Sequence, residues 1–136
     1  MSELVFTDSG VLIAAGRGPV AEAAKGVLLN SEFDFASTPF VWLEVLAKAK
    51  FTGRLNEVRF YQTYFDSVSA WADVDAELLE AAAELASRHR LSAIDALHAA
   101  ATVALNATRL VTTERAGRPL HRVCEVAVET IHSGLD

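Results

Sequence analysis

The chain has a single cysteine, Cys124, among its 136 residues. One cysteine excludes an intrachain disulfide and any zinc site built from several thiolates. Long hydrophobic runs are also missing: the uncharged stretch from Ala36 to Leu43 is broken by proline and polar residues and falls well short of the ~20 apolar residues of a membrane span. The N-terminus lacks the basic and apolar segments of a secretory signal. We therefore expect a soluble, cytoplasmic protein without membrane contact.

An excess of basic residues is absent as well. The chain has 12 Lys and Arg against 18 Asp and Glu, which gives a net charge of −6. Nonspecific binding of duplex DNA depends on cationic side chains that neutralise phosphates, so the composition argues against a protein of that class. It leaves open an enzyme that acts on nucleic acid, because acids can gather in a metal site while basic groups gather elsewhere.

The order of apolar and turn-forming segments predicts one α/β domain over residues 1–136. Strands are expected at Leu4–Phe6, Phe33–Ser37, Val68–Trp71, Leu110–Thr113 and Val123–Ile131. Helices are expected at 11–15, 20–29, 39–50, 54–65, after Asp75, and from Ser92 to Asn106. Strands that alternate with helices imply a mostly parallel sheet covered on both faces. The predicted fold class is a three-layer α/β/α sandwich with about five strands.

Proline and hydroxyl residues are expected to define three helix starts. Thr38 is a predicted N-cap with Pro39 as the first helical residue, and Ser92 is the predicted N-cap of a later helix. Pro19 is predicted to lie in the first turn of the second helix.

Two acidic residues stand out in the first half of the chain. Asp8 directly follows the first predicted strand, although Asp-Ser-Gly is also ordinary turn chemistry. Glu44 is spaced to share one helical stripe with Phe40, Ala47 and Phe51. An isolated carboxylate in an apolar stripe is costly, so Glu44 is expected either to bind a metal or to find a partner such as Lys48 at the next turn.

Two more acids stand out in the second half. Asp95 is the third residue of a helix after Ser92, a position that the helix dipole favours for a negative charge. Glu114 follows Thr112 and Thr113 at the end of a predicted strand, where it is either a site residue or an exposed loop acid beside Arg115.

These four acids are all predicted to lie near one edge of the sheet. In open parallel sheets, ligands bind beyond the carboxyl ends of the strands. Carboxylates about 5 Å apart repel each other by roughly 3 kcal/mol per pair at an effective dielectric near 20, so a cluster needs counter-charge. Mg²⁺ supplies that charge with oxygen ligands, and such centres promote in-line phosphoryl displacement. The pattern predicts metal-dependent phosphodiester hydrolysis.

The segments Val5–Ser9, Phe40–Val45 and Leu91–Ala101, with Leu110–Arg115, resemble the PIN-domain family. The resemblance extends over nearly the whole chain, and the segment around Asp95 is its most specific part. Small single-domain proteins of this kind are similar to the VapC toxins of bacterial toxin–antitoxin pairs. The resemblance implies an endoribonuclease that uses Mg²⁺ or Mn²⁺, forms a homodimer and is inhibited by a small cognate antitoxin.

The resemblance also assigns roles to individual residues. It implies that Asp8, Glu44 and Asp95 hold the metal, with Thr113 and Glu114 as further catalytic candidates that orient water. Glu114 departs from the family pattern, which more often has Asp at this position. This departure keeps open an alternative, a catalytically weak or inactive PIN-like module that binds RNA or protein. A phospho-acceptor domain of the receiver type is disfavoured because no lysine follows Lys50.

Other side chains are given weaker interpretations. The histidines lack the spacing of a His-Glu-x-x-His metal site, and His98 is expected to be a packing residue. Four aromatic residues share one helical stripe, which is expected to pack either a core or a dimer interface, and the dimer interface is the sharper prediction: Phe60, Tyr61, Tyr64 and Phe65. Alternatively, Tyr61 and Tyr64 would stack on single-stranded RNA beside Arg54 and Arg59.

Overall fold

A computed structural model describes residues 2–132 and shows a five-stranded parallel sheet in the order β3-β2-β1-β4-β5. The strands are β1 (Glu3–Thr7), β2 (Phe33–Ser37), β3 (Ala70–Trp71), β4 (Arg109–Thr112) and β5 (Ala127–Thr130). The helices are α1 (Ser9–Gly16), α2 (Ala21–Leu28), α3 (Pro39–Phe51), α4 (Leu55–Ser67), α5 (Ala76–His89) and α6 (Ala93–Ala104), with a 3₁₀ turn, η1, at Pro119–Arg122. The predicted α/β fold is confirmed.

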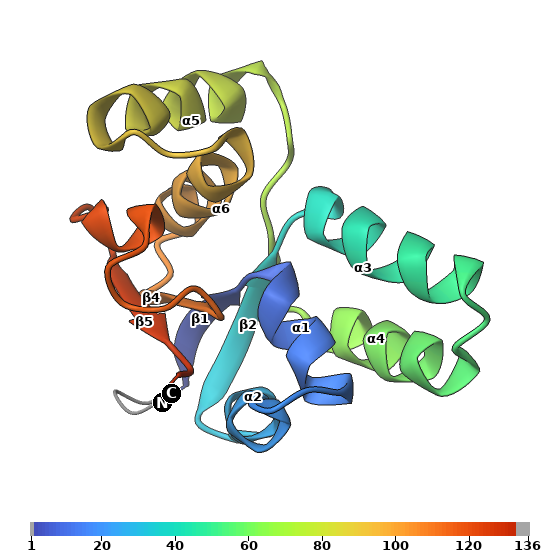
Figure 1. The fold of residues 1–136 in the computed structure, drawn as a ribbon. Helices are drawn as coiled ribbons and strands as arrows, with labels where there is room; N and C mark the ends of the chain where they lie inside the picture. The colour runs from blue at the N-terminus through green and yellow to red at the C-terminus, as the bar shows by residue number, and fades with distance from the viewer. Residues whose placement is uncertain (1, 133–136) are drawn as a thin grey trace.

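The sheet places β1 in the middle of the molecule. Val5 pairs with Phe35 of β2 on one side and with Arg109 of β4 on the other. Helices α5 and α6 lie on one side of the strands, and α1, α2 and α4 lie on the other (Figure 1). Val5 and Phe6 are fully buried because both faces of β1 are covered. The carboxyl ends of β1, β2 and β4 therefore meet at one edge.

Side-chain caps fix the helix starts at this edge. Thr38 Oγ1 accepts a hydrogen bond from Val41 N at 3.2 Å, and Pro39 is the first residue of α3, as predicted. Ser92 Oγ accepts one from Asp95 N at 3.2 Å and so caps α6. Each cap satisfies a backbone N–H that the helix itself leaves unpaired.

The C-terminal part of the chain and the second helix differ from the prediction. The last strand is confined to Ala127–Thr130, because η1 and a loop occupy the segment that precedes it. The β-branched residues from Val123 onward signalled the strand but not the turn before it. Pro19 lies in a turn outside α2, whose N-cap is Val20, so the prediction for Pro19 was wrong.

The predicted aromatic dimer stripe was also wrong. The face of α4 that packs against the core carries the buried residues Tyr61, Tyr64 and Phe65. Tyr64 Oη lies 2.8 Å from Thr7 Oγ1 of β1. These rings cannot form a dimer surface, nor can Tyr61 and Tyr64 stack on RNA. The helical spacing indicated a shared face but could not tell a core from an interface.

Within residues 2–132, no helix is long and apolar enough to cross a membrane.

Candidate active site

Asp8 stands at the end of the central strand and caps the next helix. Its Oδ1 accepts a hydrogen bond from Val11 N at 3.1 Å, and its Oδ2 accepts one from Thr112 Oγ1 at 2.5 Å. The side chain is 7% exposed. The turn interpretation of Asp8 and the site interpretation are therefore compatible, because the cap holds the carboxylate at the sheet edge.

The environment of Asp8 disfavours its charge. Burial, and to a smaller extent the charges of Asp95 and Glu114, raises the pKa of the Asp8 carboxyl to about 6 against the opposing hydrogen bonds from Thr112 and Val11. The pKa of Asp95 is raised as well, by burial and then by the charge of Glu114. The structure thus brings Asp8, Asp95 and Glu114 into one electrostatic cluster, as expected for acids from β1, α6 and β4.

Thr112 connects two of these acids and was not singled out by the sequence pattern. This fully buried residue donates its hydroxyl hydrogen to Asp8 and accepts a hydrogen bond from Glu114 N at 3.0 Å. It belongs to the strand that lies beside β1, which explains its contact with the residue after β1. The neighbouring Thr113 was the one predicted to be functional, and sequence alone offers no means of choosing between adjacent threonines.

Gly10 is a second residue that sequence reasoning missed. A methyl group placed on its Cα would lie 2.3 Å from Thr113 Oγ1 and 3.3 Å from Asp8 Oδ1. The first turn of α1 therefore packs against Thr113 at a distance that only glycine permits. The Asp8-Ser9-Gly10 sequence indicated a turn, but it did not indicate this close approach.

Glu114 has partners of its own. Arg118 Nε lies 3.5 Å from Glu114 Oε2, and His121 Nε2 lies 2.8 Å from the Glu114 carbonyl oxygen. The loop between β4 and η1 is therefore folded back onto the acid that ends the strand. Arg118 also brings positive charge near Asp95, whose pKa it lowers against the effect of burial.

Glu44 is half-buried on α3, but the predicted apolar stripe around it was wrong. Ala47 is exposed and Phe51 is 91% exposed, and α3 instead buries the face that carries Val41, Val45, Leu46 and Ala49. Nevertheless, Glu44 Oε1 is buried without a hydrogen-bond partner. No ion pair joins Glu44 to Lys48 in the part of the chain that the structure describes.

The donor set fits a hard divalent cation. It consists of carboxylates only: Asp8 and Asp95, whose pKa values are raised by neighbouring acidic charge, Glu114, which supplies such charge to both, and Glu44, whose Oε1 is buried without a hydrogen-bond partner. Among residues 2–132, these acids do not form a group with all donor atoms within 4.8 Å of one another. Mg²⁺ keeps several water ligands and binds few carboxylates directly, so wider spacing of the acids matches its coordination.

His98 is a packing residue, as predicted. It is 2% exposed, and its ring centroid lies 5.6 Å from that of Phe6 and 6.4 Å from that of Phe40. Burial lowers the pKa of His98 to about 4, so the ring is neutral at physiological pH. Its contact with Phe40 places α6 beside the first turn of α3, one turn before Glu44.

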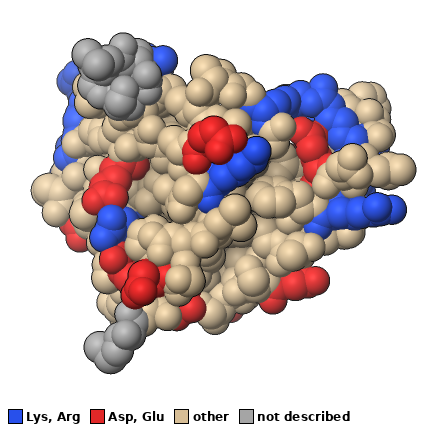
Figure 2. Space-filling model, turned by 90° about the horizontal axis from the view of Figure 1, so that it is seen from below, with Lys and Arg blue, Asp and Glu red and all other residues tan. Residues whose placement is uncertain are grey.

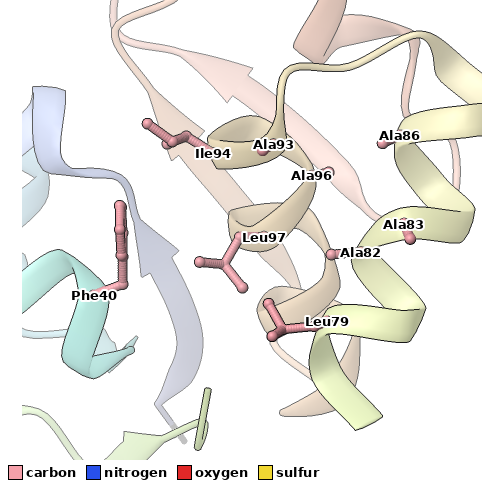
Figure 3. A pocket seen from close by; sticks show the side chains of 9 residues that line it. All are labelled: Phe40, Leu79, Ala82, Ala83, Ala86, Ala93, Ile94, Ala96 and Leu97. Atoms are coloured by element: carbon pink, nitrogen blue, oxygen red, sulfur yellow. The ribbon is translucent and has the colours of Figure 1, made fainter. Parts of the chain in front are cut away.

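An apolar groove of about 280 Å³ adjoins the start of α6. Figure 3 shows Phe40 of α3 across from Leu97 of α6, with Leu79 on α5 beside it. Ile94, next to Asp95 in the chain, is 44% exposed at this groove, and Leu79 is 51% exposed. Apolar surface therefore borders the acidic cluster.

Comparison with known proteins places this geometry in a family. The PIN-domain family model matches residues 5–125. No curated protein matches the chain. A toxin–antitoxin complex from Klebsiella pneumoniae contains a similar chain with a TM-score of 0.67 and 19% identity, over 94% of this chain and 98% of that one.

Two other solved structures share the fold. VapBC2 from Rickettsia felis, bound to a DNA fragment from its promoter, matches with a TM-score of 0.63 and 18% identity, over 93% of this chain and 98% of that one. DNA-bound VapBC from Salmonella typhimurium matches with a TM-score of 0.68 and 12% identity, over 97% and 100%. The family match extends over all the acids of the candidate site, and the chain belongs to the PIN-domain family.

Proposed function

We propose that this PIN domain is a metal-dependent endoribonuclease that hydrolyses RNA phosphodiester bonds with Mg²⁺ or Mn²⁺. The observation that carries the proposal is the buried Asp8 carboxylate, which is held beside the like charges of Asp95 and Glu114. A cation bound at this sheet edge would offset the repulsion between the carboxylates, and clusters of acids with raised pKa values are typical of functional sites. Membership of the PIN family supports the nuclease class.

In this proposal, Asp8, Glu44 and Asp95 hold the metal. A bound divalent ion would lower the pKa of a water molecule and stabilise negative charge on the phosphate oxygens. The protein's own residues orient the ligands: Thr112 fixes Asp8 through its hydroxyl group, and Ser92 holds the first turn of α6 beneath Asp95. Thr113 and Glu114 are proposed to orient the attacking water.

We further propose that the chain is the toxin of a type II toxin–antitoxin pair. The structural neighbours include a toxin–antitoxin complex and two VapBC complexes. The groove beside α6, with its exposed Leu79 and Ile94, provides the apolar surface that an antitoxin segment would cover. A homodimer remains a prediction, which size-exclusion chromatography with light scattering tests directly.

The alternative, a weak or inactive PIN-like binding module, is favoured by one observation. Glu114 is already paired with Arg118, which gives this longer acid a structural partner in place of a catalytic role. If Arg118 occupies Glu114 permanently, Glu114 is not available to orient the attacking water.

Cleavage of a panel of structured RNAs tests the proposed activity. The panel is incubated with Mg²⁺, Mn²⁺ or EDTA and with the wild type, Asp8→Asn, Asp95→Asn or Asp34→Asn. Asp34 is an exposed acid of β2 and serves as the matched control. We expect cuts that need the metal, persist in the control and disappear in both site variants. Full activity in Asp8→Asn and Asp95→Asn would overturn the site assignment.

A further inference from the structure

A second group of metal-ligating side chains lies apart from the acids discussed above. His89 is the last residue of α5, and Cys124 and Glu125 lie in the segment between η1 and β5. One donor atom from each residue lies within 4.8 Å of the other two, and no other group among residues 2–132 meets this criterion. The three residues bring a nitrogen, a sulfur and an oxygen donor to one place.

The geometry of the three donors is close to that of a coordination shell. His89 Nε2 lies 2.8 Å from Glu125 Oε1 and 3.1 Å from Oε2, and Cys124 Sγ lies 3.6 Å from Glu125 Oε1. Donors bound to one tetrahedral ion at about 2.0–2.3 Å are about 3.3–3.8 Å apart. The separations of Glu125 Oε1 from His89 Nε2 and from Cys124 Sγ lie close to this range, and all three donor atoms are within 4.8 Å of one another. The His89 side chain is only 11% exposed, and Arg122 Nη1 donates to its carbonyl oxygen at 3.2 Å. Arg122 thus fixes the backbone of His89, while burial and the hydrogen bond to Glu125 restrict the position of the nitrogen donor.

We propose that His89, Cys124 and Glu125 form a site for one zinc-like transition-metal ion, with a fourth position open to water. A thiolate and an imidazole favour Zn²⁺ or Co²⁺, whereas the acids near Asp8 offer only oxygen and favour Mg²⁺ or Mn²⁺. The two sites thus differ in metal preference. This site is independent of the proposed nuclease activity.

Arg88 supports the carboxylate without occupying all of it. Its Nη1 donates to Glu125 Oε2 at 2.5 Å, which leaves Oε1 to face His89 and Cys124. Arg88 therefore orients the Glu125 carboxylate without contacting the ion itself.

Binding requires a defined change in protonation. The Cys124 thiol loses its proton to solvent and binds as thiolate. A neutral His89 ring moves its proton from Nε2 to Nδ1, so that the Nε2 lone pair is free to bind the ion. One proton is thus released per ion when the ring starts neutral. The bound ion would join the end of α5 to the chain just before β5, which is an edge strand of the sheet.

A cobalt titration of the full chain tests the site. Co²⁺ bound to a thiolate gives a near-ultraviolet charge-transfer band, which the oxygen-only site near Asp8 cannot produce. The titration is done on the wild type, Cys124→Ser, His89→Gln and Asp8→Asn, and is followed by addition of Zn²⁺. Both substitutions at the new site keep a polar side chain, and far-ultraviolet circular dichroism checks that each variant is folded.

In the wild type, we expect a band that saturates at one Co²⁺ per chain and disappears when Zn²⁺ displaces the ion. The band should be absent in Cys124→Ser and unchanged in Asp8→Asn. In His89→Gln, the affinity for Co²⁺ should fall at least about tenfold. A wild type without the band overturns the proposal. A band of equal affinity in His89→Gln also overturns it, because the thiol would then bind the ion alone. Neither result bears on the nuclease proposal, which RNA cleavage tests separately.

Discussion

At the scale of single residues, the position of Asp8 combines two requirements that conflict in the metal-free protein. The residue caps α1 and fixes the sheet edge, yet its ionised form is disfavoured by burial and by neighbouring acids. Its pKa is raised from 3.8 to about 6. The folded state therefore prefers the protonated form, and this contribution to stability is present below pH 4 and lost as the pH rises through 6.

The Asp8→Asn variant should separate stability from activity. A shift of about two pKa units corresponds to about 3 kcal/mol, so we expect the metal-free variant to be more stable than the wild type at pH 8 by up to this amount. The gain should vanish at pH 4, and RNA cleavage should be lost. Thermal unfolding in EDTA at both pH values measures the difference.

The variant and the wild type must be compared at the same pH in this experiment, because His98 changes stability with pH in the opposite direction to Asp8. Its pKa is lowered to about 4, so its contribution to stability is present above pH 6.5 and is lost as the pH falls through 4. The difference between variant and wild type cancels this effect. A variant that is less stable than the wild type at pH 8 would contradict the account of Asp8.

Gly10 provides a second test at the residue scale. Gly10→Ala places a methyl group against Thr113 Oγ1, and overpacking of this kind costs about 1–3 kcal/mol. Gly26→Ala is the matched control, since Gly26 lies within α2 with nothing within 4 Å of the added carbon. There, alanine should stabilise the helix by about 0.5–1 kcal/mol. Urea unfolding should show opposite signs for the two variants, and equal effects would disprove the close approach.

At the scale of helices and strands, the helix caps were more predictable than the faces of the helices. The hydroxyl groups of Ser92 and Thr38 predict helix starts because they accept hydrogen bonds from backbone N–H groups a few residues later. Both form the expected hydrogen bonds. The faces of α3 and α4 depend on what the rest of the chain packs against them. Phe51 continues the spacing of the predicted stripe yet is exposed, whereas Tyr64, for which a dimer interface was preferred to a core position, is buried.

The cap of α6 should affect both stability and the site. Ser92→Ala removes the acceptor for Asp95 N, which costs about 1 kcal/mol, and it loosens the turn that carries a proposed metal ligand. We expect lower stability together with weaker Mn²⁺ binding. Ser87→Ala, at an exposed position within α5, should change neither property appreciably. Unchanged Mn²⁺ affinity in Ser92→Ala would show that the cap does not position Asp95.

Tyr64→Phe tests the reassignment of the α4 aromatic residues. The variant loses the hydrogen bond between Tyr64 and Thr7 in the core, so we expect a loss of about 1 kcal/mol. The oligomeric state measured by light scattering should not change. A shift from dimer to monomer in this folded variant would restore the interface interpretation.

At the scale of the whole molecule, acidic residues outnumber basic ones. The net charge is −6, and Figure 2 shows acidic and basic side chains interspersed over one face. The acidic excess already argued against a nonspecific duplex-DNA binder. The sequence also predicted the layered fold and the meeting of β1, α6 and β4 acids. It could not predict the contact of Thr112 with Asp8 or that of Gly10 with Thr113, because both depend on packing between distant segments. The Glu114–Arg118 pair depends on the fold of the loop after β4, for which the sequence carried no signal.

The most direct test of the central claim is a calorimetric Mn²⁺ titration of the full chain and its site variants. If Asp8, Glu44 and Asp95 share a metal, then Asp8→Asn, Glu44→Gln and Asp95→Asn should each weaken binding by about tenfold or more. Asp34→Asn should leave it unchanged. Wild-type affinity in all three site variants would contradict the shared site and, with it, the proposed nuclease mechanism.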